Sequence, residues 1–221
     1  MSIDRMGYSD HGPTHAKIVA NLALKLLRIL VKNKVTPSIV KNYNMTNEDA
    51  EVVVVLGSML HDLGIVVARE RHEVYGTLLA KDLLDEYLSI YTPEERTVFS
   101  SEVLHTIVCH EEPSKPLTVE AGIVQIADAL DMEKGRARIP FQAGKVDIHS
   151  VSALAIEKVI IQEGGKKPVT IRITMSNSAG IFQIDELLKP RIENSGLRDY
   201  FYVVGEIVGD KETRIVKKFE F

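Results

Sequence analysis

The chain has 221 residues, a formal net charge of −4 and 45% hydrophobic residues, which suits a globular protein with one large domain, or a domain and a small appendage. The negative charge argues against nucleic acid as a partner, and charged residues and glycines break every apolar run before it reaches membrane-spanning length. One cysteine, Cys109, excludes a disulfide within the chain and fits a cytoplasmic location. Residues 1–12 have no apolar core, so we expect no signal peptide.

Helical patterns fill the first half of the chain. Five segments combine apolar positions spaced near 3.6 residues with helix-start signals, and they cover residues 13–33, 47–62, 72–88, 92–112 and 118–132. Thr46, Thr92 and Thr118 are the expected caps, and Gly64 is the expected stop of the second helix. The pattern predicts a mostly α protein with a helical bundle over residues 1–140.

The pattern changes after residues 133–145, a basic stretch that contains glycine and proline. Residues 157–175 fit a β-hairpin, and residues 200–221 fit a second hairpin that turns near a Gly-Asp pair. The segment 180–196 fits either a short helix kinked at its proline or a mixture of loop and strand. We therefore predict a small α+β unit over residues 146–221. Because so few strands make a poor independent core, this unit should pack on the helical domain or on a second copy in a homodimer.

Histidine and aspartate side chains gather on the predicted helices of the first half. His15 begins the first helix, and His61 and Asp62 end the second. Asp128 lies on the apolar face of the fifth helix, where an unpaired carboxylate is costly to bury. Each residue alone is more often a hydrogen-bonded core residue. Together they predict a divalent-ion site whose imidazole and carboxylate ligands come from separate helices.

These residues resemble the signature of the HD superfamily of metal-dependent phosphohydrolases. The similarity extends over about residues 8–140 and includes, in the family's order, "DHGPTHAKIV", "SMLHDLG", "RHEVYGTLLA", "VCHEE" and "ADALD". The resemblance implies an HD-type helical bundle. It also implies an ion, of manganese, iron, magnesium, cobalt or nickel, bound by His15, His61, Asp62 and Asp128.

The same resemblance implies a second ion in many relatives. Its ligands here are His72 and His110, with Asp62 as the bridge between the two ions. Cys109 stands where relatives carry the first histidine of a His-His pair, so the three-ion version of the family's site is not expected. One or two ions per chain are expected.

Other residues carry further expectations. "DHGPTHA" is similar to a stretch of cyclic-nucleotide phosphodiesterases, which implies that His11 is a general acid acting beside Asp62; an exposed histidine is the alternative. His105 is expected to support the ligands from behind, and His149 to be structural or exposed. Candidates for binding substrate phosphate are Arg69, Arg71, Lys134, Arg136 and Arg138, although a charged run such as residues 134–138 is more often a solvated linker.

The resemblance implies hydrolysis of a phosphomonoester or phosphodiester of a small molecule, with a nucleotide as the first choice, by hydroxide on the bound ion. No membrane partner is expected. Two other classes stay open, namely a catalytically silent HD domain that senses a nucleotide or a protein, and a di-iron oxygenase of the same fold. The complete ligand set counts against the silent sensor, whereas tightly bound iron and consumption of O₂ would favour the oxygenase.

Overall fold

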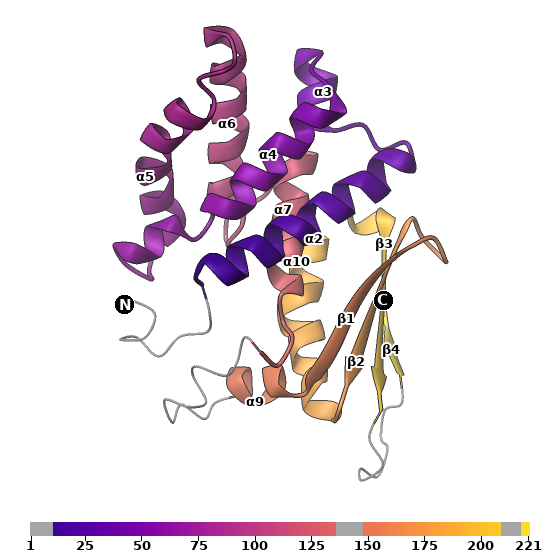
Figure 1. Ribbon diagram of the computed structural model, residues 1–221. Coiled ribbons are helices and arrows are strands. Elements are labelled where there is room, and N and C mark those ends of the chain that lie inside the picture. The colour runs from indigo at the N-terminus through magenta and orange to yellow at the C-terminus, as the bar shows by residue number, and fades with distance from the viewer. Residues whose placement is uncertain (1–10, 136–147, 209–217) are drawn as a thin grey trace.

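The computed structural model describes residues 11–135, 148–208 and 218–221 of the chain. Helices build the first of these ranges, and a sheet with short helices builds the C-terminal part (Figure 1). The mostly α fold with a small α+β unit is confirmed. Arg136, Arg138 and the predicted turn of the second hairpin lie outside the described residues. Within the described ranges, no helix has both the length and the apolar character needed to cross a membrane.

Capping residues set the starts of the main helices. The helices of the bundle are α2 (Pro13–Lys32), α3 (Ser38–Tyr43), α4 (Asn47–Leu60), α5 (His72–Tyr87), α6 (Pro93–Cys109) and α7 (Val119–Leu130). The side chains of Thr46 and Thr92 accept the backbone N–H three residues on, and the acidic residue there bonds back to complete a capping box. Thr118 caps α7 through its side chain. The three expected caps are therefore confirmed.

Five helices of the bundle carry or support the candidate site. Helix α2 packs along α4 and α7, α4 also packs on α6, and α5 covers the outer side of α6 (Figure 1). Large side chains such as Phe99, Leu26, Leu30 and Ile123 are fully buried between them. Burial of this apolar surface holds the helix ends in fixed positions, and the candidate metal ligands lie at those ends.

The C-terminal sheet has four strands in the order β1-β2-β3-β4 among the described residues. Strands β1 (Ile156–Glu163) and β2 (Val169–Met175) form the predicted antiparallel hairpin, and β3 (Phe201–Ile207) pairs antiparallel with β4 (Lys218–Glu220). Between the two pairs, β3 runs parallel to β2. A parallel neighbour requires a long connection, and helical segments provide it.

That connection contains a π-helical turn (Gln183–Leu188) and α10 (Lys189–Asn194), so the helical alternative for the segment 180–196 is confirmed. A further short helix, α9 (Ile148–Leu154), precedes β1. Helix α10 runs along α7 of the bundle (Figure 1). A Cβ at Gly122 on α7 would lie 2.5 Å from the carbonyl oxygen of Ser195, so the absent side chain permits the close contact.

A single hydrophobic core extends from the bundle into the C-terminal part. It contains bundle residues such as Ile126 together with Ile171, Ile184 and Leu188, all fully buried. The C-terminal part therefore packs on the helical domain, which is one of the two arrangements that the sequence allowed. The domain boundary between residues 140 and 146 stays a prediction.

Candidate metal centre

The first group of candidate ligands lies where α2 begins, α4 ends and α7 approaches its end. His15 Nε2 lies 3.1 Å from His61 Nε2 and 3.1 Å from Asp128 Oδ1. Asp62 Oδ2 lies 3.4 Å from His15 Nε2 and 3.2 Å from His61 Nε2. The structure thus brings together the four side chains that were predicted to hold the first ion.

The second group lies on the other side of Asp62. His72 begins α5 and His110 follows the last residue of α6, and their Nε2 atoms are 3.0 Å apart. Asp62 Oδ1 lies 3.3 Å from His72 Nε2 and 3.9 Å from His110 Nε2. Because Oδ2 faces the first group and Oδ1 the second, Asp62 has the geometry of a carboxylate that bridges two ions.

Glu111 belongs to the second group and was not assigned from the sequence. Its Oε2 lies 3.4 Å from His72 Nε2 and 3.9 Å from His110 Nε2. The available signal was its place directly after His110, beyond the end of α6. That signal is weak, because Glu112 follows with the same chemistry and only the path of the backbone decides which carboxylate faces inward.

Hydrogen bonds on the far side of the imidazole rings decide which nitrogen faces each group. The Nδ1 atoms of His61, His72 and His110 lie 2.7, 3.0 and 2.6 Å from the backbone oxygens of Ser58, Arg69 and Ile107. A carbonyl oxygen can only accept, so the Nδ1 atoms of His61 and His110 carry a proton and donate it, whereas His72 Nδ1 also lies 3.1 Å from Arg69 Nη1, which can only donate. In the neutral rings, Nε2 then presents a lone pair to the centre, as in metal-binding histidines.

His15 follows the same rule through a carboxylate. Its Nδ1 lies 2.6 Å from Asp131 Oδ2, and Asp131 is itself buried just after α7. This carboxylate fixes the orientation of the ring and raises the basicity of the nitrogen that faces the first group. The sequence reasoning missed Asp131, although the second aspartate of "ADALD" was a signal.

The donor set fits divalent ions. Each group places two imidazole Nε2 atoms 3.0–3.1 Å apart, which is unfavourable between facing lone pairs unless a cation or a proton lies between them. Carboxylate oxygens complete both groups. Mixed nitrogen and oxygen donors suit ions such as Mn²⁺ or Fe²⁺, whereas tetrahedral structural zinc prefers thiolates and histidines.

The electrostatics of the candidate ligands also favour a cation at this centre. Burial disfavours a charged His61, yet the carboxylates of Asp62 and Asp128 raise its pKa to about 9. Burial, together with the charge on His61, lowers the pKa of His110 to about 4. Burial opposes ionisation of Asp62, but His61 and His11 hold its pKa well below the usual range. The two carboxylates therefore favour positive charge at this centre.

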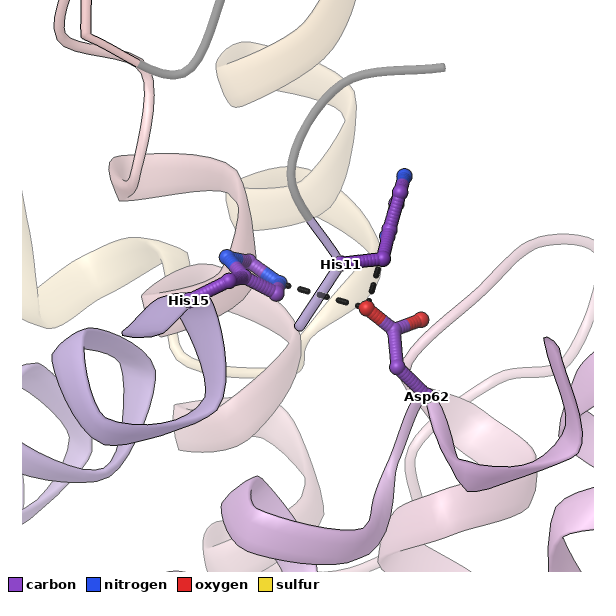
Figure 2. A group of neighbouring side chains, drawn as sticks. All are labelled: His11, His15 and Asp62. Atoms are coloured by element: carbon purple, nitrogen blue, oxygen red, sulfur yellow. Dashed lines mark hydrogen bonds and ion pairs between the residues drawn. The ribbon is translucent and has the colours of Figure 1, made fainter. Parts of the chain in front are cut away.

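His11 lies immediately before α2 and approaches the same carboxylate. Its Nδ1 is 2.6 Å from Asp62 Oδ2, and its side chain is 10% exposed. Figure 2 shows His11 and His15 on the side of Asp62 that faces the first group, with the outer end of the His11 ring directed away from the carboxylate. The structure therefore places His11 at the centre, within reach of a role as general acid or as a further ligand.

The basic residues predicted to bind phosphate are placed differently from one another. Arg69 borders the second group, with its Nη1 3.4 Å from Glu111 Oε2. Arg71 is exposed at the start of α5. Lys134 forms an ion pair with Glu157 of β1 at 2.6 Å, which directs it toward the C-terminal part. Of these residues, Arg69 has the placement that suits a contact with phosphate.

Two remaining histidines support other parts of the fold. His105 Nε2 accepts the backbone N–H of Leu117 at 3.0 Å, so it holds the segment after α6, and Cys109 Sγ lies beside the ring. His149 packs edge-on against Phe182 in the C-terminal part, in line with the expected structural role.

Comparison with known proteins agrees with this geometry. A family model described as the HD domain matches residues 13–133, a range that contains both groups of candidate ligands and Asp131. The chain is also 46% identical over 212 residues to an uncharacterized protein of Methanocaldococcus jannaschii, and the match covers 96% of this chain and 82% of that protein.

Proposed function

The chain belongs to the HD domain family, which is part of a superfamily of metal-dependent phosphohydrolases, and we propose that it hydrolyses a phosphoester of a small molecule. The observation that carries the proposal is the position of Asp62 between two histidine groups whose Nε2 atoms converge on its separate oxygens. An arrangement of this kind stabilises two ions side by side, as phosphoester hydrolysis uses them.

The ions supply positive charge for the phosphoryl oxygens and make a bound water acidic enough to lose its proton near neutral pH. The chain's own residues hold that charge in place. His15 is braced by Asp131, and His61, His72 and His110 are braced by backbone carbonyls, so the rings need little reorganisation when ions or substrate bind.

We propose that His11 is the general acid that protonates the leaving oxygen. Its Nδ1 is held at Asp62, and the other end of the ring is directed away from the carboxylate (Figure 2). A proton on that outer nitrogen can pass to an oxygen placed over the first group. Arg69, at the edge of the second group, supplies a guanidinium for the non-reacting phosphate oxygens.

The proposed substrates are nucleotide monoesters or phosphodiesters, and the proposed ions are Mn²⁺, Fe²⁺, Mg²⁺, Co²⁺ or Ni²⁺, two per chain. Support for the nucleotide comes from the relatives that the sequence resembles, and support for this class of ions comes from the mixed donor set. These five ions accept the same donor atoms, so the ion that is bound depends on its affinity for the site and on its concentration in the cell.

A screen tests the proposal. Ion-free protein is supplied with each of the five ions in turn and assayed against nucleotide monoesters, cyclic nucleotides and sugar phosphates. The readout is release of phosphate from the monoesters and conversion of the cyclic nucleotides to linear monophosphates. We expect ion-dependent hydrolysis that Asp62→Ala abolishes together with ion binding. Nucleotide binding without turnover would instead support the silent sensor, and O₂ consumption by the iron-loaded protein would support the oxygenase.

A further inference from the structure

An arginine of the C-terminal part reaches the candidate metal centre. Arg191 lies on α10, and its Nη1 donates to the backbone oxygen of His110 at 2.5 Å. Its Nη2 lies 3.9 Å from Glu111 Oε1. One guanidinium therefore contacts two consecutive residues of the second ligand group, from an element more than 75 residues further along the chain.

The contact with His110 satisfies a requirement of the helix end. His110 directly follows α6, and the last carbonyls of a helix have no partner within the helix. Arg191 supplies the missing donor for this carbonyl. Asn194, also on α10, donates to the backbone oxygen of Ser114 at 3.2 Å. Helix α10 thus fixes the backbone that leaves α6 at two points, on either side of Glu111.

The two oxygens of Glu111 have different neighbours. Oε1 is the one within 3.9 Å of Arg191, whereas Oε2 lies 3.4 Å from His72 Nε2 and 3.4 Å from Arg69 Nη1. The Arg191 and Glu111 side chains are 18% and 31% exposed, and an ion pair this long and this exposed contributes little to stability by itself. The ion pair instead suits a role in orienting the Glu111 carboxylate, because the hydrogen bond to the His110 carbonyl fixes the position of the Arg191 guanidinium.

We propose that Glu111 is a ligand of the second ion and that Arg191 is the residue that positions it, so the second ion depends on this arginine of the C-terminal part. The proposal rests on the proposed function only for the existence of a second ion between Asp62, His72 and His110. It gives the C-terminal part a role at the metal centre through a planar guanidinium, whose Nη1 and Nη2 face the His110 carbonyl and the Glu111 carboxylate in fixed directions, whereas the donors of an ammonium rotate freely.

The test is a titration of ion-free, full-length protein with Mn²⁺, followed by equilibrium dialysis with metal analysis and by electron paramagnetic resonance. Two Mn²⁺ ions bridged by a carboxylate couple magnetically, whereas a single Mn²⁺ shows the hyperfine pattern of an isolated ion. We expect Glu111→Gln and Arg191→Met to weaken the second ion by roughly 10- to 100-fold, to remove the coupled signal and to leave the first ion's affinity unchanged.

Two more variants keep the result interpretable. Arg191→Lys keeps the positive charge but lacks the two terminal nitrogens of the planar guanidinium. We expect its affinity for the second ion to fall between those of wild type and Arg191→Met. Arg172→Met is the matched control, because Arg172 is an exposed arginine of β2 whose contacts are Gln162 and Glu206. We expect it to bind both ions as the wild type does.

Three results would overturn the inference. They are a second-ion affinity in Glu111→Gln and Arg191→Met within about twofold of wild type, an equal loss of both ions in folded Arg191→Lys, and a wild-type protein that binds one ion only. Failure of the proposed function looks different. A wild type that binds two coupled ions and loses one in these variants, yet hydrolyses no phosphoester, would leave this inference intact and contradict only the activity.

Discussion

Asp62 contacts both histidine groups, one with each carboxylate oxygen. Oδ2 lies 3.2 Å from His61 Nε2, and Oδ1 lies 3.3 Å from His72 Nε2. The histidines around it are held by carbonyls, so the centre is organised before an ion arrives.

At this scale the most informative change is at His11. Replacing His11 by Asn removes the ring and its outer nitrogen while keeping a side chain that can donate to Asp62. We expect both ions to stay bound and kcat to fall by roughly 10²- to 10⁴-fold, because the leaving oxygen loses its proton donor. We also expect the alkaline limb of the pH–rate profile to disappear. Loss of an ion in His11→Asn would contradict the general acid and identify His11 as a ligand.

The sequence predicted the candidate ligands that match the HD signature, and it assigned no role to Asp131 and Glu111. His15 and Asp128 were predictable because their positions follow from helical periodicity and apolar neighbours. Asp131 and Glu111 follow α7 and α6, where the chain leaves the helix and no periodicity fixes the direction of a side chain. The role of Arg191 could not be predicted for a further reason, since its contact with His110 depends on how α10 packs on the bundle.

At the scale of elements, Gly64 controls how closely the start of α5 approaches the short 3₁₀ helix that follows α4. The sequence interpretation of Gly64 as a helix stop was wrong, because α4 ends at Leu60 and Gly64 lies within a short 3₁₀ helix (Leu63–Val66). Its backbone is not left-handed. A Cβ at Gly64 would lie 1.9 Å from the backbone oxygen of His72, so its role is steric.

This contact predicts the effect of Gly64→Ala. The methyl group must displace the start of α5, and with it His72, away from Asp62. We expect a loss of about 1–3 kcal/mol in the free energy of unfolding and a second-ion affinity weakened roughly tenfold or more. Gly135→Ala is the matched control, because nothing lies within 4 Å of a Cβ there. Wild-type ion binding and stability in Gly64→Ala would contradict this account of the contact between the 3₁₀ helix and α5.

A buried carboxyl on α6 predicts a pH-dependent stability. Glu102 is 6% exposed, and its Oε2 has no hydrogen-bond partner among the described residues. Glu120 lies nearby on α7, where it accepts the backbone N–H groups of Ser38 and Ile39 at the start of α3. Burial and the charge on Glu120 raise the pKa of Glu102 from 4.5 to about 7. The native protein therefore holds this proton more tightly than the unfolded chain does.

The sign of the effect follows from that difference. The contribution of protonated Glu102 is fully present below about pH 4.5 and is lost as the pH rises through about 7. We expect Glu102→Gln, which cannot ionise, to be more stable than wild type by about 1–3 kcal/mol at about pH 8 and equal to it at about pH 4. Urea unfolding of both proteins at the two pH values measures this. An equal difference in the free energy of unfolding at both pH values would show that ionisation of Glu102 plays no part.

On the scale of the whole molecule, the C-terminal part shares the core of the helical bundle. Leu188 in the π-helical turn is fully buried in the same cluster as Ile126 of α7. We expect Leu188→Ala to lower the free energy of unfolding by about 2–5 kcal/mol. The helices and the sheet should still unfold together in one transition. Far-ultraviolet circular dichroism and release of bound Mn²⁺ should then change at the same urea concentration. Two separate transitions would show that the two parts fold independently.

Fold class was predictable at this scale, whereas the strand order was not. Helical periodicity with threonine caps indicated the bundle, and β-branched runs around a glycine turn indicated the β1–β2 hairpin. The parallel pairing of β2 with β3 depends on α10 and the π-helical turn folding back onto α7. That contact joins residues distant in the chain, and a local pattern carries no information about it.

Reconstitution ion by ion tests the central claim most directly. Ion-free protein is titrated with Mn²⁺ while the ions bound per chain and the rate of hydrolysis of the best phosphoester substrate are measured on the same samples. The two groups around Asp62 predict no turnover without ions, maximal turnover at two ions per chain, and neither binding nor turnover in Asp62→Ala. Hydrolysis that persists in chelator-treated protein, or that is unchanged in Asp62→Ala, would contradict the account.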